Sequence, residues 1–212
     1  MRGRAGGRGG AETVSIAHHL RVLIDALAGL HHAHELRDFD GTPLSVVHRD
    51  VTPHNLFITY DGSIKVLDFG IAKAADGSSN TVTGEIKGKI SYMSPEQVRG
   101  EPLDRRSDIF AVGILLWEAV AGHRMWADLP DVTVLNELLQ GNIPSIRQAA
   151  PNVPEPVARV IERACALDRE HRYPTALAMQ RELEDLAYAM GMRVDGTEVG
   201  RVVAELDVYK RQ

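Results

Sequence analysis

Apolar side chains recur every three to four positions between residues 14 and 36, which is the spacing of one face of an α-helix. The members of this stripe are Ile16, Leu20, Leu23, Ile24, Leu27 and Leu30, and the run ends in His and Glu. Similar patterns, divided by Gly and Pro, predict further helices over about 108–121, 131–140, 155–167 and 174–190. Most of the chain is therefore expected to be helical.

Two short apolar runs, 56–59 and 64–67, have the length of strands. They are joined by Tyr60-Asp61-Gly62-Ser63, in which Asp-Gly is a strong signal for a β-hairpin. A polar stretch with several hydroxyl groups, from about 74 to 91, has the composition of a loop. We expect an α+β fold that is mostly α: one helical domain with a small hairpin.

The two ends of the chain differ from its middle. Residues 1–10 contain five Gly and three Arg, so they cannot bury apolar surface, and we expect a disordered tail over 1–12. Three Arg on such a tail are weak evidence for nucleic-acid binding, and a solvated tail is the simpler interpretation. The pattern over 191–212 is mixed and predicts no element.

Composition narrows the class of protein. The 212 residues are 44% hydrophobic and 25% charged with a formal net charge of −5, which excludes collagen-like, coiled-coil and wholly disordered chains. The mildly acidic balance predicts neither a nucleic-acid partner nor an anionic membrane surface. A single cysteine, Cys165, rules out an internal disulfide and favours the cytoplasm. The most apolar run, Ile109 to Trp117, is too short to span a bilayer and predicts a buried helix.

Three oxygen-bearing side chains surround the predicted hairpin. Asp50 and Asn55 precede it on a short loop, and Asp68 follows it. Carboxylate and amide oxygens suit Mg²⁺, which takes one or two protein ligands together with substrate phosphates. A carboxylate beside the metal, Asp50, could then accept a hydroxyl proton. The alternative interpretation is that these Asp and Asn residues only stabilise turns.

These residues stand in recognisable motifs. Residues 48–55 read HRDVTPHN and resemble the catalytic loop of the protein kinase family, and Asp68-Phe69-Gly70 resembles its metal-binding motif. Further matches follow in the family's order: Ser94-Pro95-Glu96 for Ala-Pro-Glu, Asp108 at the start of the long buried helix, and Arg172 as the partner of Glu96. The resemblance is to the C-terminal lobe of the kinase domain and covers about 13–190.

The resemblance implies roles for the residues in these motifs. Asp50 would orient the substrate hydroxyl and accept its proton, while Asn55 and Asp68 would hold Mg²⁺ on the phosphates of ATP. His48 and Phe69 would pack inside the lobe, and Phe57, with its neighbours in the first strand, would lie under adenine. Asp108 would hold the backbone of the catalytic loop.

Pro53 resembles the loop of Ser/Thr-directed kinases, so the implied substrate is a protein Ser or Thr. Arg49, beside the catalytic Asp, implies control by phosphorylation, because a phosphate could pair with its guanidinium. Thr81 and Thr83 are candidate acceptors, with Ser78 and Ser79 nearby. An ordinary solvated loop explains these hydroxyls equally well.

Two positions depart from the family pattern together. The family has Lys two residues after the catalytic Asp, where this chain has Thr52, and Thr after a later Gly, where this chain has Lys89. We hypothesise that Lys89 supplies from the opposite wall the ammonium that the catalytic loop lacks, with Thr52 as its hydroxyl partner. The alternative is two independent losses and a weakened enzyme.

A larger departure concerns the N-terminal lobe of the kinase fold. The first lysine is Lys65, so no ATP-binding Lys precedes the catalytic loop, and the glycines at 3–10 do not form a phosphate-binding loop. We expect the N-terminal lobe to be a missing partner, and the chain alone to bind ATP poorly and to self-associate through its apolar inter-lobe face. Alternatives to a Ser/Thr kinase fragment are an inactive binding module and a small-molecule phosphotransferase.

A histidine cluster, His31-His32-Ala33-His34-Glu35, also invites a zinc interpretation. It has no obvious third ligand, and His34 stands where the kinase family often has a structural His. Polar residues at a helix end are the favoured interpretation.

Overall fold

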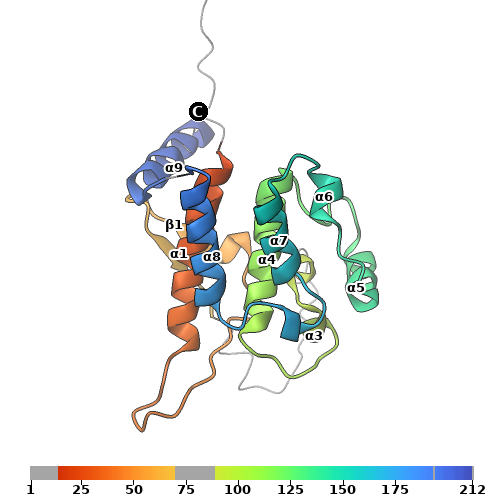
Figure 1. The fold of residues 1–212 in the computed structure, drawn as a ribbon. Helices are drawn as coiled ribbons and strands as arrows, with labels where there is room; N and C mark the ends of the chain where they lie inside the picture. The colour runs from red at the N-terminus through yellow and green to blue at the C-terminus, as the bar shows by residue number, and fades with distance from the viewer. Residues whose placement is uncertain (1–13, 70–88, 193, 212) are drawn as a thin grey trace, which may run out of the picture.

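The computed structural model describes residues 14–69, 89–192 and 194–211 (Figure 1). Its helices are α1 (Ile16–His34), α3 (Pro95–Val98), α4 (Arg106–Ala121), α5 (Asp131–Gln140), α6 (Ile146–Ala149), α7 (Glu155–Ala164), α8 (Ala176–Ala189) and α9 (Gly196–Arg211). The strands are β1 (Leu56–Ile58) and β2 (Ile64–Val66), and single 3₁₀ turns lie at Pro53–Asn55, Ile90–Tyr92 and Arg169–His171. The expected α+β fold, mostly α, is confirmed.

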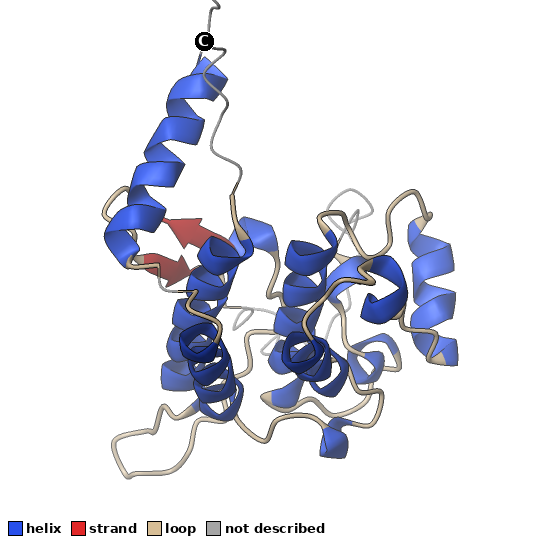
Figure 2. Cartoon of the chain, turned by 45° about the horizontal axis from the view of Figure 1, so that its top comes forward, coloured by secondary structure: helices blue, strands red, loops and turns tan. Residues whose placement is uncertain are grey.

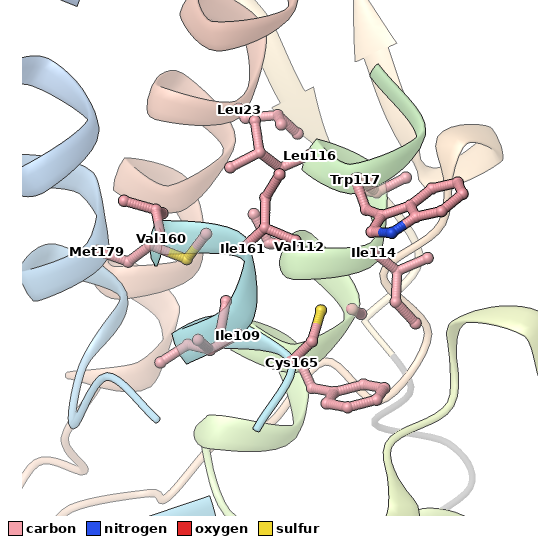
Figure 3. Close-up of a cluster of buried hydrophobic side chains, with 14 of the residues drawn as sticks. Leu23, Ile109, Val112, Ile114, Leu116, Trp117, Val160, Ile161, Cys165 and Met179 are labelled. Atoms are coloured by element: carbon pink, nitrogen blue, oxygen red, sulfur yellow. The ribbon is translucent and has the colours of Figure 1, made fainter. Parts of the chain in front are cut away.

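Helix α4 is the centre of the domain. Every residue from Ser107 to Trp117 is buried (Figure 3). Helices α1 and α7 pack against α4 over a large area, and α6 and α8 contact it over a smaller one. A helix buried on all sides needs no polar face, which explains the continuous apolar run in the sequence. The prediction of a buried helix over this run is confirmed. Gly122, with φ of 74°, ends the helix in the left-handed conformation.

Helix α1 packs along α8 on one side and on α4 on the other (Figure 1). The apolar stripe predicted from the sequence is its buried face, and Leu27 and Leu30 are completely inaccessible to solvent. At the other end of the core, Cys165 follows α7 and lies against α4 (Figure 3). Burial raises the pKa of the Cys165 thiol to about 12, so this residue is an inert core side chain.

The two strands form the predicted antiparallel hairpin, shown in red in Figure 2, with Phe57 paired to Lys65. Gly62, with φ of 80°, makes the turn that its place in the Asp-Gly pair predicts. Leu56 and Ile58 are partly buried, whereas Phe57, on the opposite face of β1, is 55% exposed.

Helix α9 occupies the stretch for which the sequence predicted no element. Its Val199 and Val202 are buried, and the helix lies beside α1 and the turn of the hairpin. The Tyr60 hydroxyl donates to Asp207 Oδ2 at 2.8 Å. The tail expected over 1–12 lies outside the described residues. Among those described, no helix has the length and apolar character that crossing a bilayer requires.

Candidate active site

A buried carboxylate at the start of α4 holds the loop between α1 and the hairpin. Asp108, 1% exposed, accepts hydrogen bonds from the backbone N–H groups of His48 and Arg49, at 2.8 and 2.9 Å. The end of α1 adds a third contact, because His34 Nε2 lies 2.8 Å from the same carboxylate. The loop is therefore anchored to two helices through one side chain.

His48 connects this loop to the segment that follows the hairpin. Its Nδ1 accepts from the Asp50 N–H at 3.2 Å, and its Nε2 donates to the Leu67 carbonyl at 2.8 Å. The ring also contacts that of Phe69, with centroids 4.5 Å apart. His48 is fully buried, so these contacts hold both neighbours of Asp68, through the Leu67 carbonyl and the Phe69 ring, near the loop that carries Asp50.

The two residues expected to hold a metal are oriented by these contacts. Asn55 donates its side-chain N–H to the Asp50 carbonyl at 2.7 Å, which leaves the amide oxygen as the group able to bind a cation. Asp68 is exposed after β2. An amide oxygen and a carboxylate fit Mg²⁺, which usually keeps waters and phosphate oxygens as its other ligands.

Backbone strain is concentrated at the same place. Of the four non-glycine residues with positive φ in the described part of the chain, Arg49 (68°) and Asp68 (56°) belong to this site. Such a conformation costs free energy and persists only where surrounding contacts enforce it. Here the Asp108 carboxylate and the His48 ring supply those contacts.

An ion pair joins the loop to the chain on the far side of the site. Lys89 Nζ lies 2.8 Å from Asp50 Oδ2. Thr52 is buried, and it lines with Lys89 a small cavity that also contacts Asp50. The structure thus brings together the two positions at which the sequence departs from the kinase pattern.

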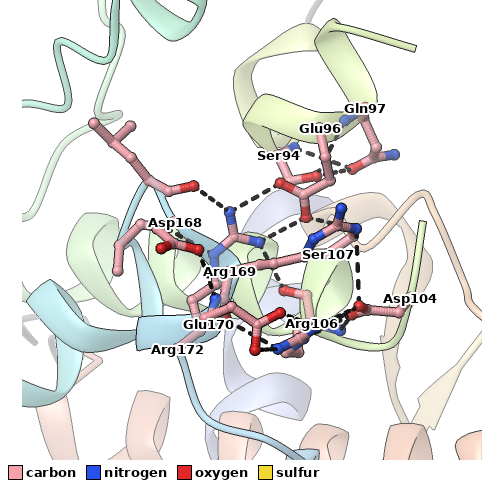
Figure 4. Close-up of polar contacts among 12 residues, drawn as sticks. Ser94, Glu96, Gln97, Asp104, Arg106, Ser107, Asp168, Arg169, Glu170 and Arg172 are labelled. Atoms are coloured by element: carbon pink, nitrogen blue, oxygen red, sulfur yellow. Dashed lines mark hydrogen bonds and ion pairs between the residues drawn. The ribbon is translucent and has the colours of Figure 1, made fainter. Parts of the chain in front are cut away.

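A second ion pair, this one buried, holds the segment after Lys89 in place (Figure 4). Arg172 donates to both carboxylate oxygens of Glu96, at 2.7 and 2.9 Å, and the Ser107 hydroxyl donates to Glu96 Oε1 at 2.7 Å. Burial alone would raise the pKa of Glu96, but the hydrogen bonds and the charge of Arg172 outweigh burial and lower the pKa to about 2. Glu96 therefore carries its charge inside the protein.

Two contacts were not anticipated from the sequence. Ser107 is the first, and nothing in its local pattern indicated a buried carboxylate partner. Gln97 is the second: it donates to the Arg49 carbonyl at 2.8 Å, which ties α3 to the catalytic loop. Ser94-Pro95-Glu96-Gln97 has the spacing of a capping box, and Ser94 and Gln97 do make the reciprocal bonds. That pattern would have placed Gln97 at a helix start.

The remaining candidate residues differ in where they lie in the structure. The side chain of Phe57 faces outward on β1, as a floor under a ligand requires. His34 is turned toward Asp108, and no group of three or more His, Cys, Asp or Glu suited to a metal occurs among the described residues. Gly70, Thr81 and Thr83 lie outside the described residues.

Comparison with known proteins identifies the architecture around this site. The family model "Protein kinase domain" matches residues 11–183. Tyrosine-protein kinase MasK of Myxococcus xanthus is 52% identical over 165 residues, which are 78% of this chain and 26% of that protein. Serine/threonine-protein kinase PrkC of Bacillus subtilis is 36% identical over 165 residues, 78% of this chain and 24% of PrkC.

Serine/threonine-protein kinase PknL of Mycobacterium tuberculosis is 34% identical over 173 residues, 82% of this chain and 41% of PknL. The chain thus spans about a quarter to two fifths of the length of these relatives. The mostly helical fold, with its single hairpin in the described residues, is that of the C-terminal kinase lobe. The chain belongs to the protein kinase family.

Proposed function

We propose that this lobe catalyses transfer of the γ-phosphoryl group of ATP to a hydroxyl group of a protein Ser or Thr. The hydroxyl oxygen forms a bond to the γ-phosphorus, the bond from that phosphorus to the β–γ bridging oxygen breaks, and its electron pair leaves with ADP. Asp50 accepts the hydroxyl proton. The observation that carries the proposal is the arrangement of Asp50, Asn55 and Asp68 around the buried His48.

Asn55 and Asp68 are the residues proposed to hold Mg²⁺, which when bound neutralises the charge on the phosphate oxygens. Phe57 supplies the exposed apolar surface on which adenine would lie. The strained backbone at Arg49 and Asp68 supports this assignment, because such strain clusters at sites of function. An inactive binding module would have no physical need for these three polar groups in this arrangement.

The acceptor class rests on Pro53 and on relatives named as serine/threonine kinases. A second candidate is tyrosine, which is favoured by the 52% identity to a protein named as a tyrosine kinase. The two classes differ in how far the hydroxyl stands from the peptide backbone, so one acceptor assay distinguishes them.

Regulation by phosphorylation is the third part of the proposal. Within the described residues, no side chain pairs with the Arg49 guanidinium, which is therefore available to a phosphate. Thr81 and Thr83 remain the proposed acceptors, and this would make the protein part of a signalling pathway.

The proposed partners are a protein substrate and an N-terminal kinase lobe that completes the nucleotide site. A largely apolar groove of about 590 Å³ runs between α1, α4, the hairpin and α9. This groove and the exposed side chains of Phe57 and Leu67 support the expectation that the chain self-associates when the N-terminal lobe is absent. We place the reaction in the cytoplasm, where ATP and a free thiol such as Cys165 coexist.

The test measures MgATP binding and phosphate transfer by the chain, alone and fused behind an N-terminal kinase lobe. Three peptide mixtures serve as substrates, and each contains Ser, Thr or Tyr as its only acceptor residue. Replacing Asp50 by Asn should lower transfer by roughly 10²–10⁴-fold, the usual contribution of a positioned acid or base. Replacing Asp68 by Asn should weaken MgATP binding more than binding of ATP without metal.

Asp185→Asn, an exposed change on α8, is the matched control and should leave both measurements unchanged. Transfer to tyrosine alone would correct the acceptor class. Absence of transfer from both proteins, with MgATP binding that is insensitive to Asp68→Asn, would establish the binding module instead.

A further inference from the structure

The carboxylate proposed to accept the substrate proton is held by a cation from a distant part of the chain. Lys89 stands 39 positions after Asp50, and its Nζ lies 2.8 Å from Asp50 Oδ2. The side chain of Asp50 is 17% exposed and that of Lys89 is 37% exposed. Among the described residues, Asp50 has no second ion pair. One carboxylate oxygen is therefore occupied, while Oδ1 remains available to a substrate hydroxyl.

The backbone of Lys89 is fixed by the turn that follows it. Its carbonyl accepts from the Tyr92 N–H at 3.1 Å. Tyr92 is buried, and its hydroxyl donates to Glu118 on α4 at 2.9 Å. Because the turn is anchored to the central helix, the lysine side chain starts from a defined point and loses less conformational entropy when it pairs with Asp50.

Thr52 and Lys89 line the same small cavity, which Asp50 also lines. Only two positions separate Thr52 from Asp50, and Thr52 is 5% exposed. The cavity is barely large enough for one water molecule, at about 10 Å³, and both residues line it. A lysine side chain at position 52 would start in this cavity beside Asp50, and a threonine at position 89 would leave room for it.

We propose that Lys89 is a positioning residue that acts through Asp50, and that Lys89 and Thr52 form an interchangeable pair around one carboxylate. This proposal rests on the proposed phosphotransfer. Lys89 holds the Asp50 side chain in one orientation and directs Oδ1 toward the acceptor hydroxyl. Lys89 belongs to the segment that leads into α3. The position of that segment therefore controls whether the Asp50 side chain is oriented toward the acceptor hydroxyl.

The first test needs no enzymatic activity. The protein is labelled with ¹³C at the aspartate carboxyl carbons, and Asp50→Asn assigns the Asp50 resonance. Lys89→Ala should shift this resonance, and the double exchange Lys89→Thr with Thr52→Lys should return it toward its original position. Arg181→Ala removes an exposed positive charge from α8 and should leave the Asp50 resonance unchanged.

The second test measures phosphate transfer by the fused protein described above. Lys89→Ala should lower kcat by roughly 10²-fold, comparable to the loss of one oriented polar group, while KM for ATP stays constant. Lys89→Arg should retain much of the activity, because its guanidinium can also pair with Asp50. The double exchange should recover most of the loss, whereas Arg181→Ala, an exposed change on α8, should have no effect.

An unchanged Asp50 resonance and kcat in Lys89→Ala would overturn the positioning role. Failure of the double exchange to recover both signals, in a protein that remains folded, would overturn the interchangeable pair. If the wild-type protein transfers no phosphate, the proposed function fails. The carboxyl resonances then still decide whether Lys89 holds Asp50.

Discussion

Arg172 and Glu96 show how much of the structure depends on one pair of side chains. Besides Glu96, the Arg172 guanidinium donates to the backbone carbonyls of Ala166, Leu167 and Arg106. It also lies over the ring of Phe110, 4.8 Å from the centroid. The pair therefore joins the start of α3, the start of α4 and the chain after α7. Both side chains are almost completely buried.

This pair should dominate the response of the protein to acid. The folded-state pKa of Glu96 is lowered from 4.5 to about 2, so its contribution is present above pH 4.5 and is lost as the pH falls toward 2. The lowered pKa corresponds to about 3 kcal/mol at neutral pH. Glu96→Gln should destabilise the protein by about 3–5 kcal/mol at pH 7, because it leaves Arg172 buried without a counter-charge.

Urea unfolding at a series of pH values measures this effect. The stability difference between the wild type and Glu96→Gln should narrow as the pH falls below 4.5, because the Glu96 carboxyl then becomes protonated in the unfolded chain while it stays charged in the folded protein down to about pH 2. Glu101→Gln, an exposed change close by, should show a constant difference near zero. A difference between wild type and Glu96→Gln that is independent of pH would show that the charge of Glu96 does not stabilise the fold.

The separate residues of the site differ in how far the sequence could predict them. Motif spacing placed Asp50, Asn55, Asp68, Glu96, Asp108 and Arg172 in order, and the structure contains the Arg172–Glu96 and Asp108–loop contacts. Ser107 was missed because its partner is 11 positions away, beyond the reach of any helical pattern. Contacts of this kind depend on how the helices are packed, which the local sequence does not encode.

At the scale of the elements, α4 and the C-terminal end of α7 pack closely together at Gly113. A Cβ added at Gly113 would lie 2.8 Å from both Ala164 Cβ and Cys165 Sγ. No real side chain tolerates such distances, so glycine at this position allows the two helices to touch. In a helix this absence of a side chain is otherwise unfavourable, by about 1 kcal/mol relative to alanine.

Gly113→Ala should therefore destabilise the protein by about 1–3 kcal/mol, because overpacking exceeds the gain in helix propensity. Gly29, in α1, is the matched control: its added Cβ would meet only Val66 Cγ2, at 3.4 Å. Gly29→Ala should leave the stability unchanged or raise it by up to about 1 kcal/mol. Thermal unfolding of both variants measures the contrast, and equal effects would contradict the packing argument.

Elements with a strong period were predicted within a few residues of their ends. The α5 prediction, 131–140, has the observed bounds, and α1 was predicted two residues too long at each end. The short α3 and α6 were not predicted, because four residues contain little more than one turn of pattern. Helix α9 was missed for another reason: two glycines weaken its pattern, and its helical form is stabilised by the surface on which it packs.

At the scale of the whole molecule, α9 joins the C-terminal part of the described chain to the hairpin near the candidate site. The α9 backbone at Gly196 and Gly200 passes next to the turn between β1 and β2. The hairpin follows Asn55 directly and carries Phe57, so the same small sheet contributes to the proposed nucleotide site and supports α9. The turn between β1 and β2 thus supports both the proposed nucleotide site and α9, which lie far apart in the sequence.

The two glycines of α9 make different contacts, and this difference tests how the helix is attached. A Cβ at Gly200 would lie 2.2 Å from the Tyr60 carbonyl oxygen, whereas one at Gly196 would lie 3.5 Å from the Gly62 carbonyl oxygen, an ordinary contact. Gly200→Ala should therefore detach α9, and Gly196→Ala should not. Hydrogen exchange should show faster exchange of the α9 amides in Gly200→Ala alone, while α4 stays protected because its contacts lie elsewhere. Equal protection of α9 in both variants would mean that the hairpin turn yields to the added methyl group, and that the close backbone approach does not determine where this helix lies.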